Sequence, residues 1–454
     1  MVLSSLCESS ILPLRRPEAM MLYEPIGHDP AHWPDSYWRA SCPALPPCPP
    51  LARSSTVDVA IIGAGYAGLN AALELVESHG ADVAVLEAAQ PGWGASGRNG
   101  GFCCLGGTKL DATAITRRIG AAGAAEWDAF EHAGIARVRD NLARYRIDAQ
   151  TTETGEIQLA ANARAWARMQ RAGGEVLDAT QLREHGLNTA VYPGGAMTRA
   201  GFGLHPYAYV TGLARAALAA GVALHGDSRV TGLTPAQAGW TVQTAQGQVH
   251  ARQVLIATNG YSDERLPGWL HRRILPALSH VMVTEPIAPA DLQAQGWTRH
   301  LMAYDSRTLL HYFRLLPDNR MLFGARGGMS FRPAPVARFA REARQAFDMI
   351  FPAWQAVPAA YHWNGLVCLT TSRAPYIGPV PGAPGLFLAL GWHGNGVAAA
   401  SHGGRCAARA LMGVADAAPR LTRRPPARFP LPRKLALRAG MALAGLIDGP
   451  LRPR

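Results

Sequence analysis

Residues 56–68 of the chain read TVDVAIIGAGYAG, a short apolar run that leads directly into three closely spaced glycines. The run is rich in β-branched residues, which is typical of a strand buried in a parallel sheet. A second run of this kind, DVAVL, occupies residues 82–86, and the helix-like stretch 69–78 lies between the two. This order predicts a βαβ unit, in which a crossover helix joins two parallel strands.

The glycines follow the pattern G-x-G-x-x-G at the turn from the first strand into its helix. Gly63 permits the tight turn, Gly65 lets a pyrophosphate approach the backbone, and Gly68 lets the helix pack closely on the strand. Tyr66 and Ala67 stand at the helix start, where free N–H groups and the helix dipole favour a phosphate. A glycine turn without a ligand is the alternative, but the βαβ setting favours dinucleotide binding.

An acidic residue closes the second strand. Glu87 lies 19 residues after Gly68, where a carboxylate accepts hydrogen bonds from the adenosine ribose hydroxyls. Its charge would repel the 2′-phosphate of NADP. Because FAD and NAD share this fingerprint, the turn and the acid predict a dinucleotide without choosing between them.

Residues 92–101 read GWGASGRNGG, a glycine-rich loop just after the second strand. Such a loop suits close passage of the backbone along a ligand. The stretch resembles the flavin-contacting segment of the glycine oxidase and D-amino-acid oxidase family, especially the branch that includes gamma-glutamylputrescine oxidoreductase. The resemblance implies that the dinucleotide is FAD.

Further blocks resemble this family in the same order. They are SYW at 36–38, HP at 205–206, ATNGY at 257–261, TEP at 284–286, HYFR at 311–314, LFGAR at 322–326 and GWHGNGV at 391–397. The resemblance implies an α/β fold in which a discontinuous Rossmann-type FAD-binding domain is joined to an antiparallel-sheet substrate domain. Beside the glycine turn and Glu87, the implied FAD contacts are Ala88, Ser96, Gly97, Arg98, Asn99, Gly100, Val230, Thr258, Asn259, Gly394, Asn395, Gly396 and Val397.

The expected organisation has four parts. Residues 1–54 are a Pro-rich arm that we expect to be extended, because dense prolines disfavour helix. Patterning predicts hairpins at 240–255 and 309–324 and a helix over 396–411. The FAD-binding domain is assigned to 55–150, 202–275 and 362–413, the substrate domain to 151–201 and 276–361, and a basic tail to 414–454.

Three positions depart from the family. Ser372 stands where the family commonly has an aspartate, which removes a charge beside the expected ribityl side. No histidine lies in 92–101 for covalent flavin attachment, although Cys103 and Cys104 are near, so we expect non-covalent FAD. Leu322 falls where related oxidases carry a lysine that activates dioxygen, so either dioxygen or another electron acceptor remains open.

The resemblance implies oxidation of a small amine or amino acid by hydride transfer to flavin N5, giving an imine that hydrolyses. Backbone donors at 394–397 suit the ring as it becomes anionic. Candidate catalytic residues are His393, Tyr312 and Arg326. Alternation in the strand puts Tyr312 and Arg314 on one face, and Arg314 or Arg326 could clamp a carboxylate. Each arginine could equally be solvated, His393 could be structural, and Trp363 could line the pocket or the core.

Charge and cysteine content limit the partners and the compartment that we expect. The formal net charge is +12, but lysine occurs only at 109 and 434, and nine basic residues lie beyond residue 416 against one acid. We therefore expect no nucleic-acid partner. Seven cysteines without a secretory pattern favour a reducing cytoplasm. The tail could pack on the body or lie on an anionic membrane surface.

Two other functions stay open on sequence grounds. An NAD(P)H-dependent flavin hydroxylase would usually carry a second nucleotide fingerprint, and we find no further G-x-G-x-x-G after a strand. An RNA-associated flavoprotein would use the arginine-rich tail to bind phosphates. No repeat pattern and no apolar run of about 20 residues is present.

Overall fold

The computed structural model describes residues 22–453, and it contains two sheets. The first has the strand order β16-β17-β10-β1-β2-β7, with β8 and β9 as a side hairpin on β10. Strand β1 is parallel to β2, as the two buried runs predicted, and also to β10. The strands are β1 (Ser55–Ile62), β2 (Val83–Leu86), β7 (Ala223–His225), β8 (Gly232–Ala236), β9 (Gly239–Gln243), β10 (Gln248–Ile256), β16 (Tyr376–Pro379) and β17 (Leu386–Leu390).

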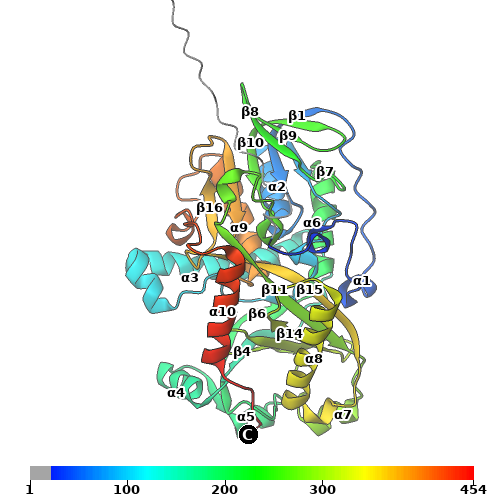
Figure 1. Cartoon of the computed structure of the whole chain (residues 1–454), viewed down its shortest axis with the longest axis vertical. Helices are drawn as coiled ribbons and strands as arrows, with labels where there is room; N and C mark the ends of the chain where they lie inside the picture. The colour runs from blue at the N-terminus through cyan, green and yellow to red at the C-terminus, as the bar shows by residue number, and fades with distance from the viewer. Residues whose placement is uncertain (1–21, 454) are drawn as a thin grey trace, which may run out of the picture.

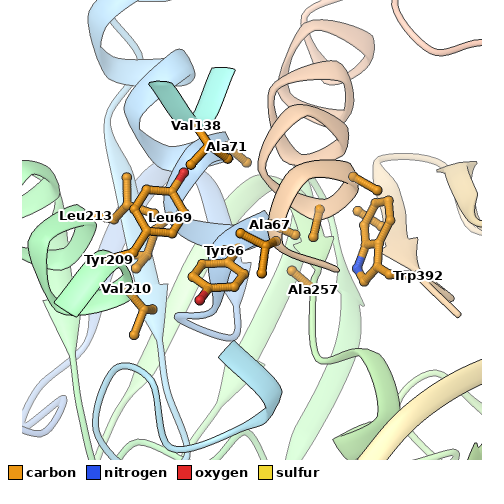
Figure 2. Packing of buried hydrophobic residues seen from close by; sticks show 14 of the residues in the cluster. Tyr66, Ala67, Leu69, Ala71, Val138, Tyr209, Val210, Leu213, Ala257 and Trp392 are labelled. Carbon is orange, nitrogen blue, oxygen red and sulfur yellow. The ribbon is translucent and has the colours of Figure 1, made fainter. Parts of the chain in front are cut away.

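Helices cover this sheet and bury its apolar side chains. Helix α2 carries the glycine turn at its start and packs against α9 and α6. Figure 2 shows Tyr66 and Ala67 of α2 in one cluster with Tyr209 of α6 and Trp392, and the rings of Tyr66 and Tyr209 lie 5.0 Å apart. The bounds are α2 (Tyr66–His79), α3 (Ala112–Arg144), α6 (Pro206–Ala219) and α9 (Gly396–Leu411); α3 has a non-helical break at Gly120.

The second sheet has the order β15-β11-β14-β13-β12-β4-β6-β3, with β5 paired to β6. It is antiparallel as expected except where β4 and β12 run parallel. The strands are β3 (Phe102–Cys103), β4 (Thr154–Leu159), β5 (Val176–Asp178), β6 (Gly194–Gly203), β11 (Ile274–Thr284), β12 (Met302–Asp305), β13 (His311–Leu315), β14 (Met321–Arg326) and β15 (Ala359–Thr370). Strand β15 runs through the expected domain boundary at 362 because it stays paired with β11 up to Thr370.

The remaining helices surround the second sheet. Helix α8 covers one face and closes a core with Phe313, Phe323 and Trp354. Figure 1 shows α10 in red in front of this sheet and α8 in yellow to its right. The bounds are α4 (Ala163–Ala172), α5 (Ala179–Glu184), α7 (Pro289–Gln295), α8 (Pro333–Ile350) and α10 (Arg433–Asp448).

The described part of the N-terminal arm is not wholly extended. A short helix α1 (Tyr37–Ala40) forms ahead of the prolines, where the Ser36 side chain caps the Arg39 N–H. Trp38 of this helix is 1% exposed, so the arm packs on the body. The expectation of an extended arm was therefore wrong at 37–40, and its residues 1–21 lie outside the described residues.

The basic tail packs on the second sheet through one face of α10. Leu437 and Ala444 are buried, Arg433 forms an ion pair with Glu264, and Asp448 accepts hydrogen bonds from the backbone of Thr308 and Leu309. The other face exposes Leu435, Leu443, Leu446 and Ile447. Packing of the tail is confirmed, and the membrane-surface role of its exposed face stays a prediction. Over residues 22–453 no helix has the length and apolar character of a membrane span.

Replacing Leu437 by alanine should lower the free energy of unfolding by about 2–3 kcal/mol, because its side chain packs with Leu275, Leu278 and Leu366. Leu446, which is 83% exposed on the same helix, provides the control, and L446A should change stability by less than about 0.5 kcal/mol. Urea unfolding followed by fluorescence measures both values. Equal effects of the two substitutions would contradict the packing of α10.

Candidate active site

A cavity of about 590 Å³ lies where the two sheets meet. Its upper wall consists of the ends of β1, β2 and β10, at Gly63, Glu87 and Ala257. Its lower wall consists of residues from β4, β12, β13 and β14 of the second sheet. Ligands of open parallel sheets bind beyond the carboxyl ends of the strands, so the cavity lies where the glycine turn predicted a dinucleotide.

The glycine turn has the geometry that the sequence predicted. Gly63 has φ of 108°, a conformation that favours glycine. A Cβ at Gly68 would collide with the Gly63 carbonyl oxygen, so helix and strand touch through their backbones. A Cβ at Gly65 would lie 2.9 Å from the Ser96 hydroxyl. Gly63, Gly65, Tyr66 and Ala67 line the cavity, whereas Gly68 supports the turn from behind.

Glu87 sits at the end of β2 with a fixed carboxylate. One oxygen accepts a hydrogen bond from the Ala64 N–H at 2.8 Å, and the other accepts one from Ala89 at 3.1 Å. Burial raises the pKa of this carboxyl, which the nearby backbone N–H groups and Arg229 partly oppose. Ribose hydroxyls would add donors here. Ala88 and Val230 line the cavity beside it.

The loop 92–101 is held in shape by its own side chains. The Asn99 amide donates to the carbonyls of Ala95 and Ser96, both at 3.0 Å, and its oxygen accepts from Gly101 at 2.8 Å. The Arg98 side chain donates to the Trp93 carbonyl at 2.6 Å. Ser96, Arg98, Asn99 and Gly100 line the cavity, but Gly97 does not and instead contacts the loop backbone.

The segment 394–397 lies at the N-terminus of α9 and lines the cavity. Gly394 has φ of 98°, and a Cβ there would collide with the Arg326 guanidinium. The Asn395 amide donates to the Leu105 carbonyl at 2.8 Å. Thr258 and Asn259 line the cavity at the end of β10, and the Asn259 side chain accepts from Gly391 at 3.0 Å. The two cofactor segments therefore converge, as the resemblance implied.

His393 does not line the cavity, in contrast to the expected catalytic role. Its ring is 2% exposed, and Nε2 lies 3.1 Å from the Thr370 hydroxyl. Burial lowers its pKa to about 3, so the ring is neutral. The Ser372 hydroxyl belongs to the same buried group, 2.9 Å from Thr370. His393 has a positive φ of 52°, and its side chain lies outside the cavity that its neighbours Trp392 and Gly394 line.

Strand β13 alternates as predicted. Tyr312 lines the cavity, and its hydroxyl lies 3.1 Å from the Ser279 hydroxyl. Arg314 points the same way but is 1% exposed and does not line the cavity. It donates to the carbonyls of Gly100 and Leu204, at 2.9 and 2.6 Å. The role of Arg314 as a carboxylate clamp is therefore wrong, and this arginine instead positions the loop. Trp363 is a core residue, 2% exposed.

Two cations meet in the cavity. Arg326 lines it from the end of β14, and Lys109 reaches into it from the segment after β3, where its side chain is accessible to solvent. The charge of Arg326 lowers the pKa of Lys109 to about 7. No ion pair joins either cation to an acid within residues 22–453. Sequence reasoning included Arg326 but missed Lys109, whose only local signal was the rarity of lysine in this chain.

Acidic and polar groups occupy another part of the wall. Glu156 and Gln158 line the cavity from β4, while Ile157 between them enters the core of the second sheet. Tyr304 and Cys104 lie beside Glu156. Sequence reasoning also missed Glu156. Residues 156–159 read EIQL, and this alternation of polar and apolar residues could have indicated that Glu156 faces away from the core.

Comparisons with known proteins agree with this site. Residues 58–410 match the family described as FAD dependent oxidoreductase. The chain is 31% identical over 431 residues to gamma-glutamylputrescine oxidoreductase of Escherichia coli, covering 92% of this chain and 98% of that protein. It is also 31% identical to the probable oxidoreductase OrdL of Haemophilus influenzae, covering 80% of this chain and 85% of that one.

Solved structures show the same fold. Glycine oxidase from Bacillus cereus superposes with a TM-score of 0.64 at 19% identity, covering 83% of this chain and 100% of that one. Iminodiacetate oxidase from Chelativorans also has a TM-score of 0.64, at 19% identity, and the match covers 81% of this chain and 100% of that one. The glycine turn, the end of β2 and the N-terminus of α9 form one lined cavity that fits FAD. The chain belongs to the family of FAD-dependent oxidoreductases.

Proposed function

We propose that this chain oxidises a carbon–nitrogen bond in a small amine or amino acid, with FAD bound non-covalently. The observation that carries the proposal is the single cavity that joins the nucleotide end at Glu87 to the second-sheet wall at Tyr312 and Arg326. The printed names of the relatives support the chemistry, because gamma-glutamylputrescine and glycine are both amines.

Different residues of the cavity would hold different parts of FAD. Glu87, Ala88 and Val230 would hold the adenosine ribose, and the glycine turn would hold the pyrophosphate at the start of α2. The isoalloxazine would lie among the loop 96–100, Thr258, Asn259 and the segment 394–397. Backbone N–H groups at the start of α9 suit the pyrimidine edge, where negative charge develops on reduction.

When bound, FAD supplies a two-electron acceptor that takes the hydride at N5. The chain supplies orientation and charge. Arg326 and Lys109 would bind a substrate carboxylate, since two neighbouring cations without an acidic partner in the described chain suit an anion. Tyr312 would form the wall against which the substrate carbon lies. Loss of the hydride leaves a C=N bond that water hydrolyses. Dioxygen or another acceptor then takes the electrons.

Acid precipitation of the purified holoprotein should release yellow FAD into the supernatant. No histidine lies in 92–101, and burial raises the pKa of the Cys103 and Cys104 thiols, so neither is a thiolate able to attack the ring. Absorbance of supernatant and pellet checks this. Flavin that stays in the pellet would contradict non-covalent binding, and a colourless protein after reconstitution with FAD would contradict the cofactor site.

Replacing Glu87 by arginine should weaken FAD binding. The ribose hydroxyls lose an acceptor and meet a cation, which costs on the order of 1–3 kcal/mol, or roughly a 5- to 150-fold rise in Kd. Fluorescence titration of the apoprotein with FAD measures the change. The control is Glu184→Arg, the same charge reversal on the exposed surface of α5, which should bind FAD like the wild type. Tight binding by E87R would refute the assignment of Glu87.

Substrate class can be tested by anaerobic mixing of the holoenzyme with glycine, L-proline, iminodiacetate, gamma-glutamylputrescine and putrescine. Bleaching of the flavin absorbance by at least one of them is expected. Arg326→Met should weaken the binding of panel members that carry a carboxylate by about 2 kcal/mol or more, which corresponds to a roughly 30-fold rise in KM. The KM for putrescine, which has no carboxylate, should change little. Arg341→Met, an exposed arginine of α8, is the control. Equal loss for putrescine would contradict a carboxylate-binding role.

A further inference from the structure

One carboxyl group in the cavity wall lacks a full set of partners. Glu156 is 4% exposed, lines the cavity, and its Oε2 atom has no hydrogen-bond partner among residues 22–453. An unpaired buried carboxylate costs several kcal/mol unless a cation or donors compensate it. An unpartnered carboxyl oxygen that lines a cavity can be compensated by a ligand that brings a positive charge or a hydrogen-bond donor.

The alternation of side chains along β4 places Glu156 on the face that lines the cavity. Ile157 and Leu159 of β4 are 0% exposed and pack into the core of the second sheet, so Glu156 and Gln158 occupy the opposite face. The neighbouring groups are the Cys104 thiol and the Tyr304 hydroxyl, and neither brings a positive charge. Glu131 of α3 adds a further acid nearby. Burial raises the pKa of both acids to about 7, so this region carries a partial negative charge near neutral pH, and no cation pairs with Glu156 within residues 22–453.

The two cations of the cavity, Lys109 and Arg326, line the same space as Glu156. No ion pair links Glu156 to either cation in the described part of the chain. The substrate end of the cavity thus offers a negative group and two positive groups that do not neutralise one another directly. An amine that also carries a carboxylate complements both.

We propose that Glu156 binds the ammonium group of the substrate and accepts its proton before oxidation. This role rests on the proposed function. The N–H bond of the ammonium breaks, an O–H bond forms on the Glu156 carboxylate, and the electron pair left on nitrogen then forms the C=N bond. The hydride leaves the adjacent carbon with its own electron pair for FAD, the oxidant of the proposed function, so charge and electrons balance.

The charges facing Glu156 set the pH range of this step. Burial raises its pKa to about 7, Cys104 and Tyr304 lower it, and Glu131 raises it. Below that pH the carboxyl is protonated and cannot accept a proton. Flavin reduction should therefore accelerate as pH rises through about 7. The charge of Arg326 lowers the pKa of Lys109 to about 7, so Lys109 loses its charge over the same interval and the substrate carboxylate is held less tightly at high pH. Rates are therefore compared at saturating substrate, where the pH dependence reports the proton-accepting step at Glu156.

The test measures anaerobic flavin reduction in a stopped-flow instrument between pH 5.5 and 9, with the member of the amine panel that reduces the wild type fastest. Glu156→Gln should slow reduction by roughly 10²-fold or more and should remove the rise near pH 7. The control is Glu131→Gln, a neighbouring acid of α3 that does not line the cavity. It should keep both the rate and the rise, displaced slightly to lower pH because a like charge is removed.

Thermal unfolding supplies a readout that does not depend on turnover. Ionisation of Glu156 opposes folding as pH rises from its ordinary value of 4.5 to about 7. E156Q should therefore gain Tm over the wild type, and the gain should be larger at pH 8 than at pH 5. A Tm loss, or a pH rise that survives in E156Q, would overturn the role of Glu156 alone. FAD-loaded wild type that no panel amine reduces would overturn the proposed function and this role together.

Discussion

The site depends on backbone-to-backbone packing of α2 against its two neighbours. A Cβ at Gly68 would collide with the Gly63 carbonyl oxygen of the turn, and a Cβ at Gly404 would collide with the Ala67 carbonyl oxygen. Helix α2 is therefore held between the end of β1 and α9 at a distance that side chains would not allow. Because of this spacing, the glycine turn and the segment 394–397 line one cavity although more than 300 residues separate them.

A second set of contacts fixes the loop that the cofactor would touch. The carbonyls of Arg98, Asn99 and Gly100 each accept a hydrogen bond from a different part of the chain. The donors are Trp363 of β15 at 2.8 Å, Trp38 of α1 at 2.9 Å and Arg314 of β13 at 2.9 Å. The N-terminal arm, the edge strand β15 and the central strand β13 of the second sheet thus hold one turn of backbone. This arrangement explains why Trp38 and Arg314 are each only 1% exposed.

What the sequence could predict followed from local chemistry. The β1–α2–β2 order, the hairpins of β9 with β10 and of β13 with β14, and the bounds of α9 were expected, because periodicity and turn residues encode them within a few residues. The direction of side chains outside a regular strand could not be predicted in this way. His393 lies between cavity-lining residues in sequence, yet its backbone turns it into the core. Lys109 and Glu156 reach the cavity only because β3 and β4 join the second sheet.

The charges of the cavity show how a binding site differs from a core. A core of this size pairs its ionisable groups or excludes them, as Asp305 does by accepting a hydrogen bond from Tyr192 at 3.0 Å. Here Glu156, Lys109 and Arg326 line one space without an ion pair between them in the described residues, and the environment of each opposes its charged form. Folding alone gains nothing from that arrangement. Under the proposed function a dipolar substrate would relieve all three at once, so the same groups that reduce stability in its absence would provide affinity and orientation in its presence.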